Sequence, residues 1–182
     1  MHHFIFPTQD TWISSGSSTI DGTSFRDQNF GRDQILEVKK FFYNNQFDHQ
    51  TRALVNFAGT DFTNMSQSIV DGTITNPKFY LRLYEAQGNS SLSEEYKLAI
   101  QPISQSWIEG TGKFGDRPKN TNGCSWENRS NPIGGTEVTW SNADGTSAYG
   151  VSILNVSSSV QSFSNESPDV EVEVTDMVNM EC

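Results

Sequence analysis

The segment 76–85, with the sequence NPKFYLRLYE, constrains the fold of this chain more than any other. Its side chains alternate strictly in character, with Phe79, Leu81 and Leu83 in one set and Tyr80, Arg82 and Tyr84 in the other. An alternation with period two places one set on a buried face of a β-strand and the other on a face that is at least partly wet. The segment therefore predicts a strand in a sheet that covers a core with one side.

Similar short runs recur along the chain, with turn-forming residues between them. The segments that we predict as further strands are 10–14, 35–38 with an extension over 39–42, 51–57, 96–103, 137–140, 157–163 and 170–175. We predict turns over 44–49 and 88–91. The spacing of apolar residues predicts one short helix over 62–71 that ends at Gly72. Together these elements predict an all-β fold, a single jelly-roll-like β-sandwich of about eight short antiparallel strands, forming one domain over 1–182.

The formal net charge of −10 and the isoelectric point near 4.6 argue against nucleic acids and anionic membranes as partners. Nucleic acids and anionic membranes attract clustered Lys and Arg side chains, whereas the basic residues here are scattered. The chain has no apolar run long enough to span a bilayer, and its first residues lack the pattern of a signal peptide. We therefore expect synthesis in the cytoplasm, with Cys124 and Cys182 as free thiols.

Residues with catalytic or metal-binding chemistry form no recognisable pattern. His2, His3 and His49 belong to no ligand motif, and the carboxylates of Glu94 and Glu95 lie beside a turn, where a solvated charge cluster is expected. We therefore predict a protein that is not an enzyme and has no cofactor. Calcium stays open as an alternative because acidic loops bind it, although no regular ligand spacing is present. Its candidate ligands are Asp10, Asp27, Asp33, Asp169 and Asp176.

The long loop over 110–135 and the residues just before it contain many of the aromatic and charged side chains that could contact a partner or ligand. Loops of this length are unusual in a compact domain. Its candidate contact residues are Trp107, Glu109, Lys113, Phe114, Arg117, Trp126 and Arg129. Trp and Arg are typical of protein–protein hot spots, and aromatic rings with polar neighbours also bind sugars. The third alternative is that Trp107 and Trp126 fold inward and anchor the loop. Solvent exposure of Trp126 and Phe114 distinguishes these alternatives. We expect Glu109 to form a surface ion pair with Lys113 or Arg117.

Several motifs occur in an order that is known from one family. They are Asp10-Thr-Trp-Ile, 30–36, Thr51-Arg-Ala-Leu-Val-Asn-Phe57, Leu81-Arg-Leu-Tyr84, Trp107-Ile-Glu-Gly-Thr-Gly112, Val138-Thr-Trp140 and 174–179. Together they resemble the DNRLRE-type β-sandwich family, whose members are modules of cell-surface and secreted bacterial proteins. The segments 113–118, 123–129 and 161–166 are most similar to structural proteins of T4-like marine cyanophages.

This resemblance implies a virion protein that is made in the host cytoplasm. Its expected role is structural or that of an adaptor, in the neck, tail, baseplate, fibre attachment or head decoration. Its expected partners are other virion proteins, in a homo-oligomer or another symmetric assembly, with neither nucleic acid nor membrane. The alternative is a carbohydrate-binding module that recognises glycans of the host surface through the same loop aromatics.

The end of the chain departs from the family pattern. In the family, the segment that corresponds to 174–179 is followed by an aromatic residue, a turn and a final strand, whereas this sequence stops at Cys182. We expect either a truncated sequence or a domain without its C-terminal strand. A missing strand would leave an unpaired sheet edge near Cys182, and such an edge invites strand addition from another chain.

Overall fold

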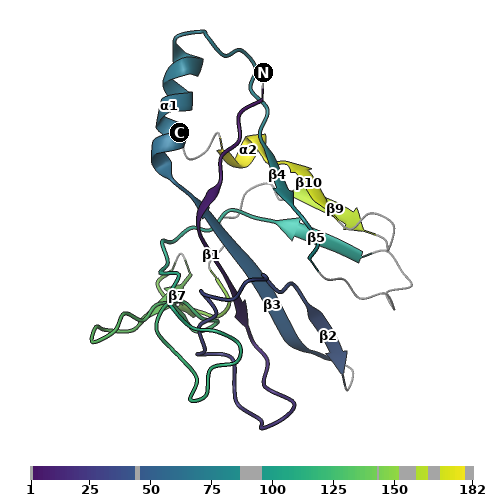
Figure 1. Ribbon diagram of the computed structural model, residues 1–182, viewed down its shortest axis with the longest axis vertical. Coiled ribbons are helices and arrows are strands. Elements are labelled where there is room, and N and C mark those ends of the chain that lie inside the picture. The colour runs from purple at the N-terminus through teal and green to yellow at the C-terminus, as the bar shows by residue number, and fades with distance from the viewer. Residues whose placement is uncertain are drawn as a thin grey trace. The chain divides into compact units, whose positions relative to one another are not determined.

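The structure is a computed structural model that describes residues 2–43, 46–86, 96–142, 144–151, 159–163 and 169–178. Its strands are β1 (Pro7–Ser14), β2 (Lys40–Tyr43), β3 (Gln46–Phe57), β4 (Tyr80–Leu83), β5 (Tyr96–Ile100), β6 (Asn128–Ser130), β7 (Val138–Ser141), β8 (Ser147–Ala148), β9 (Ser159–Phe163) and β10 (Val170–Glu173). Two helices, α1 (Gly59–Val70) and α2 (Thr175–Val178), complete the described elements (Figure 1). All strand pairs are antiparallel, so the predicted all-β class is confirmed, while the sandwich arrangement stays a prediction.

Contacts divide the chain into two compact units, each built from two separate stretches of sequence. Unit 1 comprises residues 1–58 and 103–152, and unit 2 comprises residues 59–102 and 153–182. The prediction of one domain over the whole chain stays a prediction. Each unit is therefore described by itself.

The main sheet of unit 1 has the strand order β1-β3-β2, and Figure 1 shows β3 between its two partners. Residues 11–14 of β1 are all buried. Because successive side chains of a strand point to opposite faces, Trp12 and Ile13 enter different apolar clusters. The Trp12 cluster consists of Trp12, Phe25 and Phe30. The Trp140 cluster consists of Ile13, Leu54, Trp107, Cys124, Trp126, Trp140, Ala148 and Val151.

A second sheet of unit 1 has the order β6-β7-β8 and supplies Trp140, the fully buried tryptophan of the Trp140 cluster. Trp140 of β7 is 0% exposed, and its indole Nε1 donates a hydrogen bond to the Ser125 carbonyl at 2.8 Å. The buried ring thus has its single polar group satisfied, as a Trp in a core requires. The predicted strand over 137–140 is confirmed here, shifted by one residue.

Unit 2 contains the pairs β10-β4 and β5-β9. Gln161 of β9 connects them, because its Nε2 donates to the Asp169 carbonyl at 3.0 Å and its Oε1 accepts from the Glu171 backbone N–H at 2.9 Å. On β4, Tyr80 and Arg82 are exposed while Leu81 and Leu83 are half-buried, which confirms the two faces predicted for this strand.

Helix α1 of unit 2 confirms the predicted short helix, which begins at Gly59 rather than near residue 62. Gly72 has a φ of +70°, and its backbone N–H donates to the Ile69 carbonyl at 3.0 Å. A residue in this left-handed conformation after the last turn is a common helix stop, and glycine adopts it without a steric penalty.

Two predictions for residues before β3 and at its beginning are wrong. Residues 35–38 form no strand, because Leu36 packs against the Trp12 cluster while Ile35 and Val38 are exposed, so the run does not alternate between two faces. The residues 46–49, predicted as part of a turn, belong to β3, where pairing with β2 outweighs their turn propensity. Within the predicted loop, 128–130 form β6. The turn over 88–91, Glu94 and Glu95 lie outside the described residues.

Candidate functional site

The candidate site is the loop over 107–129 in unit 1, and the buried amide of Asn29 is one of the groups that attach it to the loop over 25–33. Asn29 is 0% exposed. Its Nδ2 donates to the carbonyls of Glu109 at 2.7 Å and Cys124 at 2.8 Å. Its Oδ1 accepts from the backbone N–H groups of Gly31 at 3.1 Å and Gly112 at 2.8 Å. The amide thereby uses two donors and two acceptor positions, which fully satisfies its hydrogen-bonding capacity.

Glycines surround Asn29 because the two loops approach each other closely. A Cβ at Gly110 would lie 2.1 Å from the Asn122 carbonyl oxygen and 2.4 Å from Asn29 Oδ1. Comparable clashes with backbone atoms or with Asn29 would occur at Gly31, Gly112 and Gly123. The glycines of this loop therefore allow the backbones of the two loops to pack closely, and the backbone from 109 to 124 is held in one conformation.

The tryptophans of the loop point inward. Trp107 is 9% exposed and Trp126 is 7% exposed, and both belong to the Trp140 cluster. The Arg52 guanidinium lies over the Trp126 ring, 5.0 Å from its centroid, and donates to the Gly150 carbonyl. Burial lowers the pKa of Arg52. Of the three alternatives for this loop, the geometry agrees with the one in which Trp107 and Trp126 anchor it.

Phe114 is the aromatic residue of the loop that stays at the surface, where it is 50% exposed. Its ring lies over the Trp12 cluster, with centroid distances of 6.2 Å to Trp12 and 5.4 Å to Phe25. Asp33 fixes this arrangement, since its carboxylate accepts from Trp12 Nε1 at 3.0 Å and from the Phe114 backbone N–H at 3.1 Å. One face of the Phe114 ring therefore packs inward and the other meets solvent.

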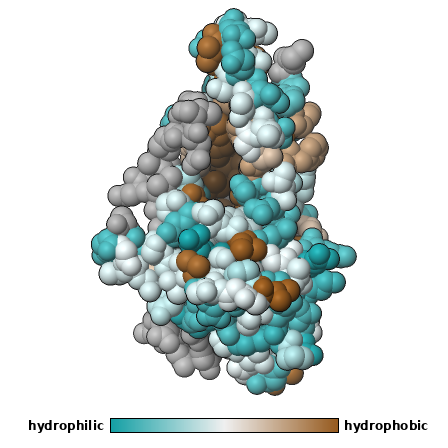
Figure 2. All heavy atoms as spheres, turned by 90° about the vertical axis from the view of Figure 1, so that its left-hand side faces the viewer, coloured by the Kyte–Doolittle hydropathy of each residue, from teal (hydrophilic) through white to brown (hydrophobic). Residues whose placement is uncertain are grey.

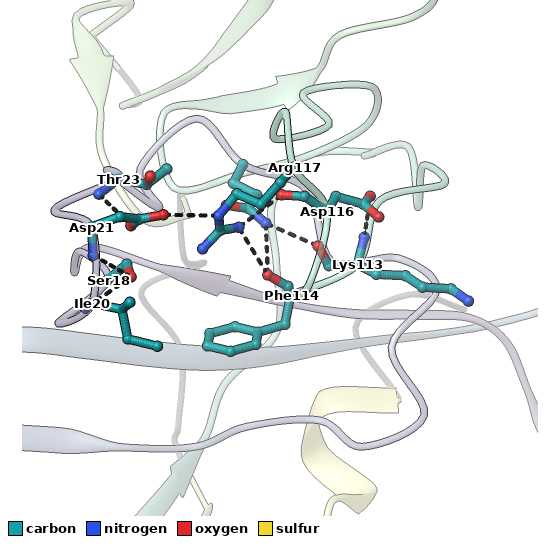
Figure 3. Close-up of polar contacts among 9 residues, drawn as sticks. Ser18, Ile20, Asp21, Thr23, Lys113, Phe114, Asp116 and Arg117 are labelled. Atoms are coloured by element: carbon teal, nitrogen blue, oxygen red, sulfur yellow. Dashed lines mark hydrogen bonds and ion pairs between the residues drawn. The ribbon is translucent and has the colours of Figure 1, made fainter.

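A polar network next to Phe114 joins the loop over 18–23 to the loop over 113–117, as Figure 3 shows. Arg117 Nε donates to Asp21 Oδ2 at 3.0 Å, and Arg117 Nη1 donates to the carbonyls of Phe114 at 3.3 Å and Asp116 at 2.7 Å. The Lys113 backbone N–H donates to Asp116 Oδ2 at 2.9 Å. Arg117 is thus held by hydrogen bonds from two of its nitrogens, while no bond to its Nη2 is formed by the described residues.

Hydrogen bonds within the turn over 18–23 keep the carboxyl group of Asp21 ionised for this ion pair. The Thr23 backbone N–H donates to Asp21 Oδ1 at 3.0 Å and is the largest cause that holds the pKa of Asp21 well below its ordinary value. The hydroxyls of Ser18 and Thr23 lower this pKa further, and Arg117 contributes the least. The carboxylate of Asp21 is therefore ionised mainly because of its own loop.

We predict that an NMR titration will find the Asp21 carboxyl group still ionised at a pH where ordinary aspartates are protonated. The Arg117→Gln variant should keep most of this depression, because the Thr23 N–H remains. Since the folded pKa lies below the unfolded value of about 3.9, this group contributes to stability above that pH and loses its contribution as the pH falls. An ordinary pKa in the wild type would show that the turn over 18–23 does not form.

The remaining predicted site residues, Glu109 and Arg129, form hydrogen bonds with backbone groups of unit 1. The predicted ion pair of Glu109 is wrong, because Glu109 Oε1 accepts from the Asp10 backbone N–H at 3.2 Å and Arg117 pairs with Asp21. Arg129 Nη1 donates to the Ser106 carbonyl at 3.0 Å. These two contacts satisfy backbone groups at a strand edge and at a loop, so they stabilise the fold locally.

The aspartates considered for calcium do not gather in the described residues. Asp27 pairs with Lys119 Nζ at 2.5 Å. Asp33 accepts the bonds from Trp12 and Phe114, whereas Asp169 accepts from the Glu85 backbone N–H at 3.0 Å. Asp10, Asp27 and Asp33 belong to unit 1, and Asp169 and Asp176 belong to unit 2. Within the described ranges no three His, Cys, Asp or Glu side chains are close enough to hold a metal ion.

Two important residues were missed from the sequence. Asn29 and Gln28 are both 0% exposed, and Gln28 Nε2 donates to the Lys113 carbonyl at 2.9 Å while its Oε1 has no partner among the described residues. The signal that was available is the row of glycines at 110, 112 and 123, since close packing of backbones at several glycines calls for a side chain that satisfies the enclosed polar groups.

Cys124 is a free thiol with 0% exposure, and burial raises its pKa. We predict that iodoacetamide will leave Cys124 unmodified in the native protein and will alkylate it after denaturation in guanidinium. Peptide mapping by mass spectrometry separates the Cys124 peptide from that of Cys182, which lies outside the described residues. Rapid native labelling of Cys124 would mean that the loop opens readily, because only the exposed thiolate reacts.

The surface around the site is mainly hydrophilic. In the lower part of Figure 2, hydrophobic side chains lie as separate brown groups among teal and white ones. A shallow groove of about 660 Å³ is lined by residues 116–122 and 131–135, and Arg117 belongs to its wall. The groove is polar and open, and therefore differs from the enclosed apolar pockets that hold small cofactors.

Comparisons with known proteins add no identification. No family model, no curated protein and no solved structure matches the chain significantly. Among the described residues, neither helix has the length and apolar character that a membrane span requires.

Proposed function

We propose that this protein is a non-enzymatic structural or adaptor component of a bacteriophage particle that works through protein–protein contacts. The particle context rests on the sequence motifs that resemble cyanophage structural proteins. The contact role is supported by one observation above all. The loop over 107–129 is held in a single path by Asn29 and its glycine neighbours, yet Lys113, Phe114 and Arg117 remain exposed on it.

A loop that is rigid before binding suits an assembly protein. Ordering a flexible loop on association costs roughly 0.5–1.5 kcal/mol for each immobilised side chain. In this loop the backbone is already ordered by buried hydrogen bonds, and Arg117 is already positioned by Asp21. Binding would therefore lose little conformational entropy, which favours specific contacts between subunits.

The alternative of host-glycan binding has less support at this loop. A sugar platform needs exposed, coplanar aromatic rings. Trp107 and Trp126 are buried. The Phe114 ring lies next to Trp12, and the planes of the two rings are inclined by 31°. A single half-exposed ring offers a small stacking surface, whereas a ring with charged neighbours is typical of a protein contact.

The proposal is tested by asking whether the protein is part of a particle. Antibodies raised against the recombinant chain should bind purified cyanophage particles whose genome encodes it, and immunogold labels should appear at one defined position. Mass spectrometry of the same particles should detect the chain in a fixed ratio to the other virion proteins. Absence of the chain from purified particles, with the protein present in infected cells, would refute the virion role.

A further inference from the structure

Strand β4 is an open edge among the described strands of unit 2. It pairs with β10 alone, and Gln161 of β9 bonds to the opposite edge of β10 (Figure 1). An edge strand carries backbone N–H and C=O groups that a strand of another chain can bind. The partner of such an edge is selected by the backbone groups that face outward and by the side chains that flank them.

The backbone groups of Tyr80 and Arg82 face the open edge. The Val174 backbone N–H donates to the Phe79 carbonyl at 2.8 Å, so the backbone of Phe79 faces β10. Because the backbone groups of a strand alternate between its two edges, Leu81 also faces β10 and its two neighbours face away. Among the described residues, no other strand bonds to the backbone of Tyr80 or Arg82. Each of the two therefore offers one donor and one acceptor.

The side chains of the segment 78–84 alternate without interruption. Those at 78, 80, 82 and 84 are exposed, and those at 79, 81 and 83 are half-buried. On the exposed face, Lys78 Nζ donates to Glu173 Oε2 at 3.3 Å and Arg82 Nε donates to Glu171 Oε2 at 2.8 Å. The cations of the segment are thus neutralised within one copy, while Tyr84 remains 77% exposed beside them.

The segment 78–84 is complementary to itself when two copies run antiparallel with Leu81 opposite Leu81. On the exposed face each cation then lies opposite a tyrosine, and on the other face each apolar side chain lies opposite an apolar one. Glu85 lies opposite Pro77, so it does not meet the same carboxylate of the other copy. The facing pairs are Lys78–Tyr84, Phe79–Leu83, Tyr80–Arg82 and Leu81–Leu81.

Other registers of the same edge are less favourable. A shift by two residues in one direction places Arg82 opposite Arg82, and a shift in the other direction places Lys78 opposite Arg82. Like charges directly opposite each other destabilise a strand pair. A shift by one residue pairs an outward backbone with an inward one and loses the hydrogen bonds. The side chains therefore favour the register that is centred on Leu81.

We propose that β4 pairs with β4 of a second copy of this chain, antiparallel and with a twofold axis at Leu81. Tyr80 of each copy would exchange both backbone hydrogen bonds with Arg82 of the other, and one sheet would continue across the two copies. This inference goes beyond the proposed function, because it concerns unit 2 and applies to the isolated chain.

Sedimentation velocity of the full chain over a range of loading concentrations tests the pairing. An edge contact is small, so we expect monomers at low concentration and dimers above roughly 100 µM. Tyr80→Pro removes an N–H that faces outward and leaves the bonds to β10 intact, so it should abolish the dimer without altering the far-UV circular dichroism. The control Tyr80→Thr keeps the N–H and should retain a weaker dimer.

Disulfide trapping tests the register, in a Cys182→Ser background where the buried Cys124 is the only native thiol. A mixture of the Tyr80→Cys and Arg82→Cys variants should form the crosslinked dimer, because opposite residues of a strand pair are close enough for a disulfide. Either variant alone should crosslink far less. This measurement also decides the matter if Tyr80→Pro fails to fold.

The inference is overturned if the wild type stays monomeric, if Tyr80→Pro and Tyr80→Thr dimerise equally well, or if Arg82→Cys alone crosslinks as efficiently as the mixture. A monomeric chain that is present in purified particles would refute the β4 edge alone. A dimer with the predicted crosslink, in a chain that is absent from particles, would refute the virion role alone.

Discussion

The Asn29→Ala variant should lose about 4 kcal/mol or more of the unfolding free energy of unit 1, since a buried polar group left without a partner costs about 1–3 kcal/mol. The change removes partners from the carbonyls of Glu109 and Cys124 and from the N–H groups of Gly31 and Gly112. It also leaves a small cavity at a position that is 0% exposed. We expect the loop over 107–129 to lose its fixed path together with this stability.

Chemical denaturation followed by tryptophan fluorescence measures this effect selectively. The four tryptophans at positions 12, 107, 126 and 140 all belong to unit 1. The matched control is Asn56→Ala on β3, which removes an exposed amide that bonds to Gln9 Oε1 at 3.0 Å and should cost less than about 0.5 kcal/mol. A loss in Asn29→Ala no larger than in Asn56→Ala would mean that the amide does not hold the two loops together.

The second large effect is expected for Gly110→Ala in the same unit. Gly110 has a φ of +84°, which alone costs roughly 1–2 kcal/mol for a residue with a Cβ. The added methyl group would also lie 2.1 Å from the Asn122 carbonyl oxygen, and backbone atoms cannot move away without displacing the loop. We therefore expect a loss of at least about 3 kcal/mol, within the range known for strain and overpacking together.

Gly115→Ala is the control within the same loop. A Cβ at Gly115 meets nothing within 4 Å, and its φ is not in the left-handed region. Its substitution should leave stability unchanged or raise it slightly, because alanine restricts the unfolded chain. Equal denaturation midpoints for Gly110→Ala and Gly115→Ala would contradict the close approach of the two loops around Asn29.

Local patterns in the sequence determined several of the strands and the helix stop. The alternation of Tyr80 and Arg82 with Leu81 and Leu83 identifies β4 and its exposed face, since the side chains of a strand point to alternating sides wherever it pairs. Gly72 marks the end of α1 because its left-handed conformation depends on the residue itself. The net charge of −10 also predicts that the protein has no nucleic-acid partner, since net charge is a property of composition.

Tertiary structure decided the rest, because the deciding interactions join residues far apart in the chain. The composition of the loop over 107–129 left open whether Trp107 and Trp126 are exposed, and only their packing with Ile13 and Trp140 answers this. Asn29 looks like an ordinary loop residue until Glu109 and Cys124 are placed around it. Glu109 was expected to pair with Lys113 or Arg117 of the same loop, yet Glu109 accepts from the Asp10 backbone N–H and Arg117 pairs with Asp21, which only the fold brings within 3.0 Å. Side-chain partners depend on distances in space, and a local sequence pattern contains no information about contacts between separate loops.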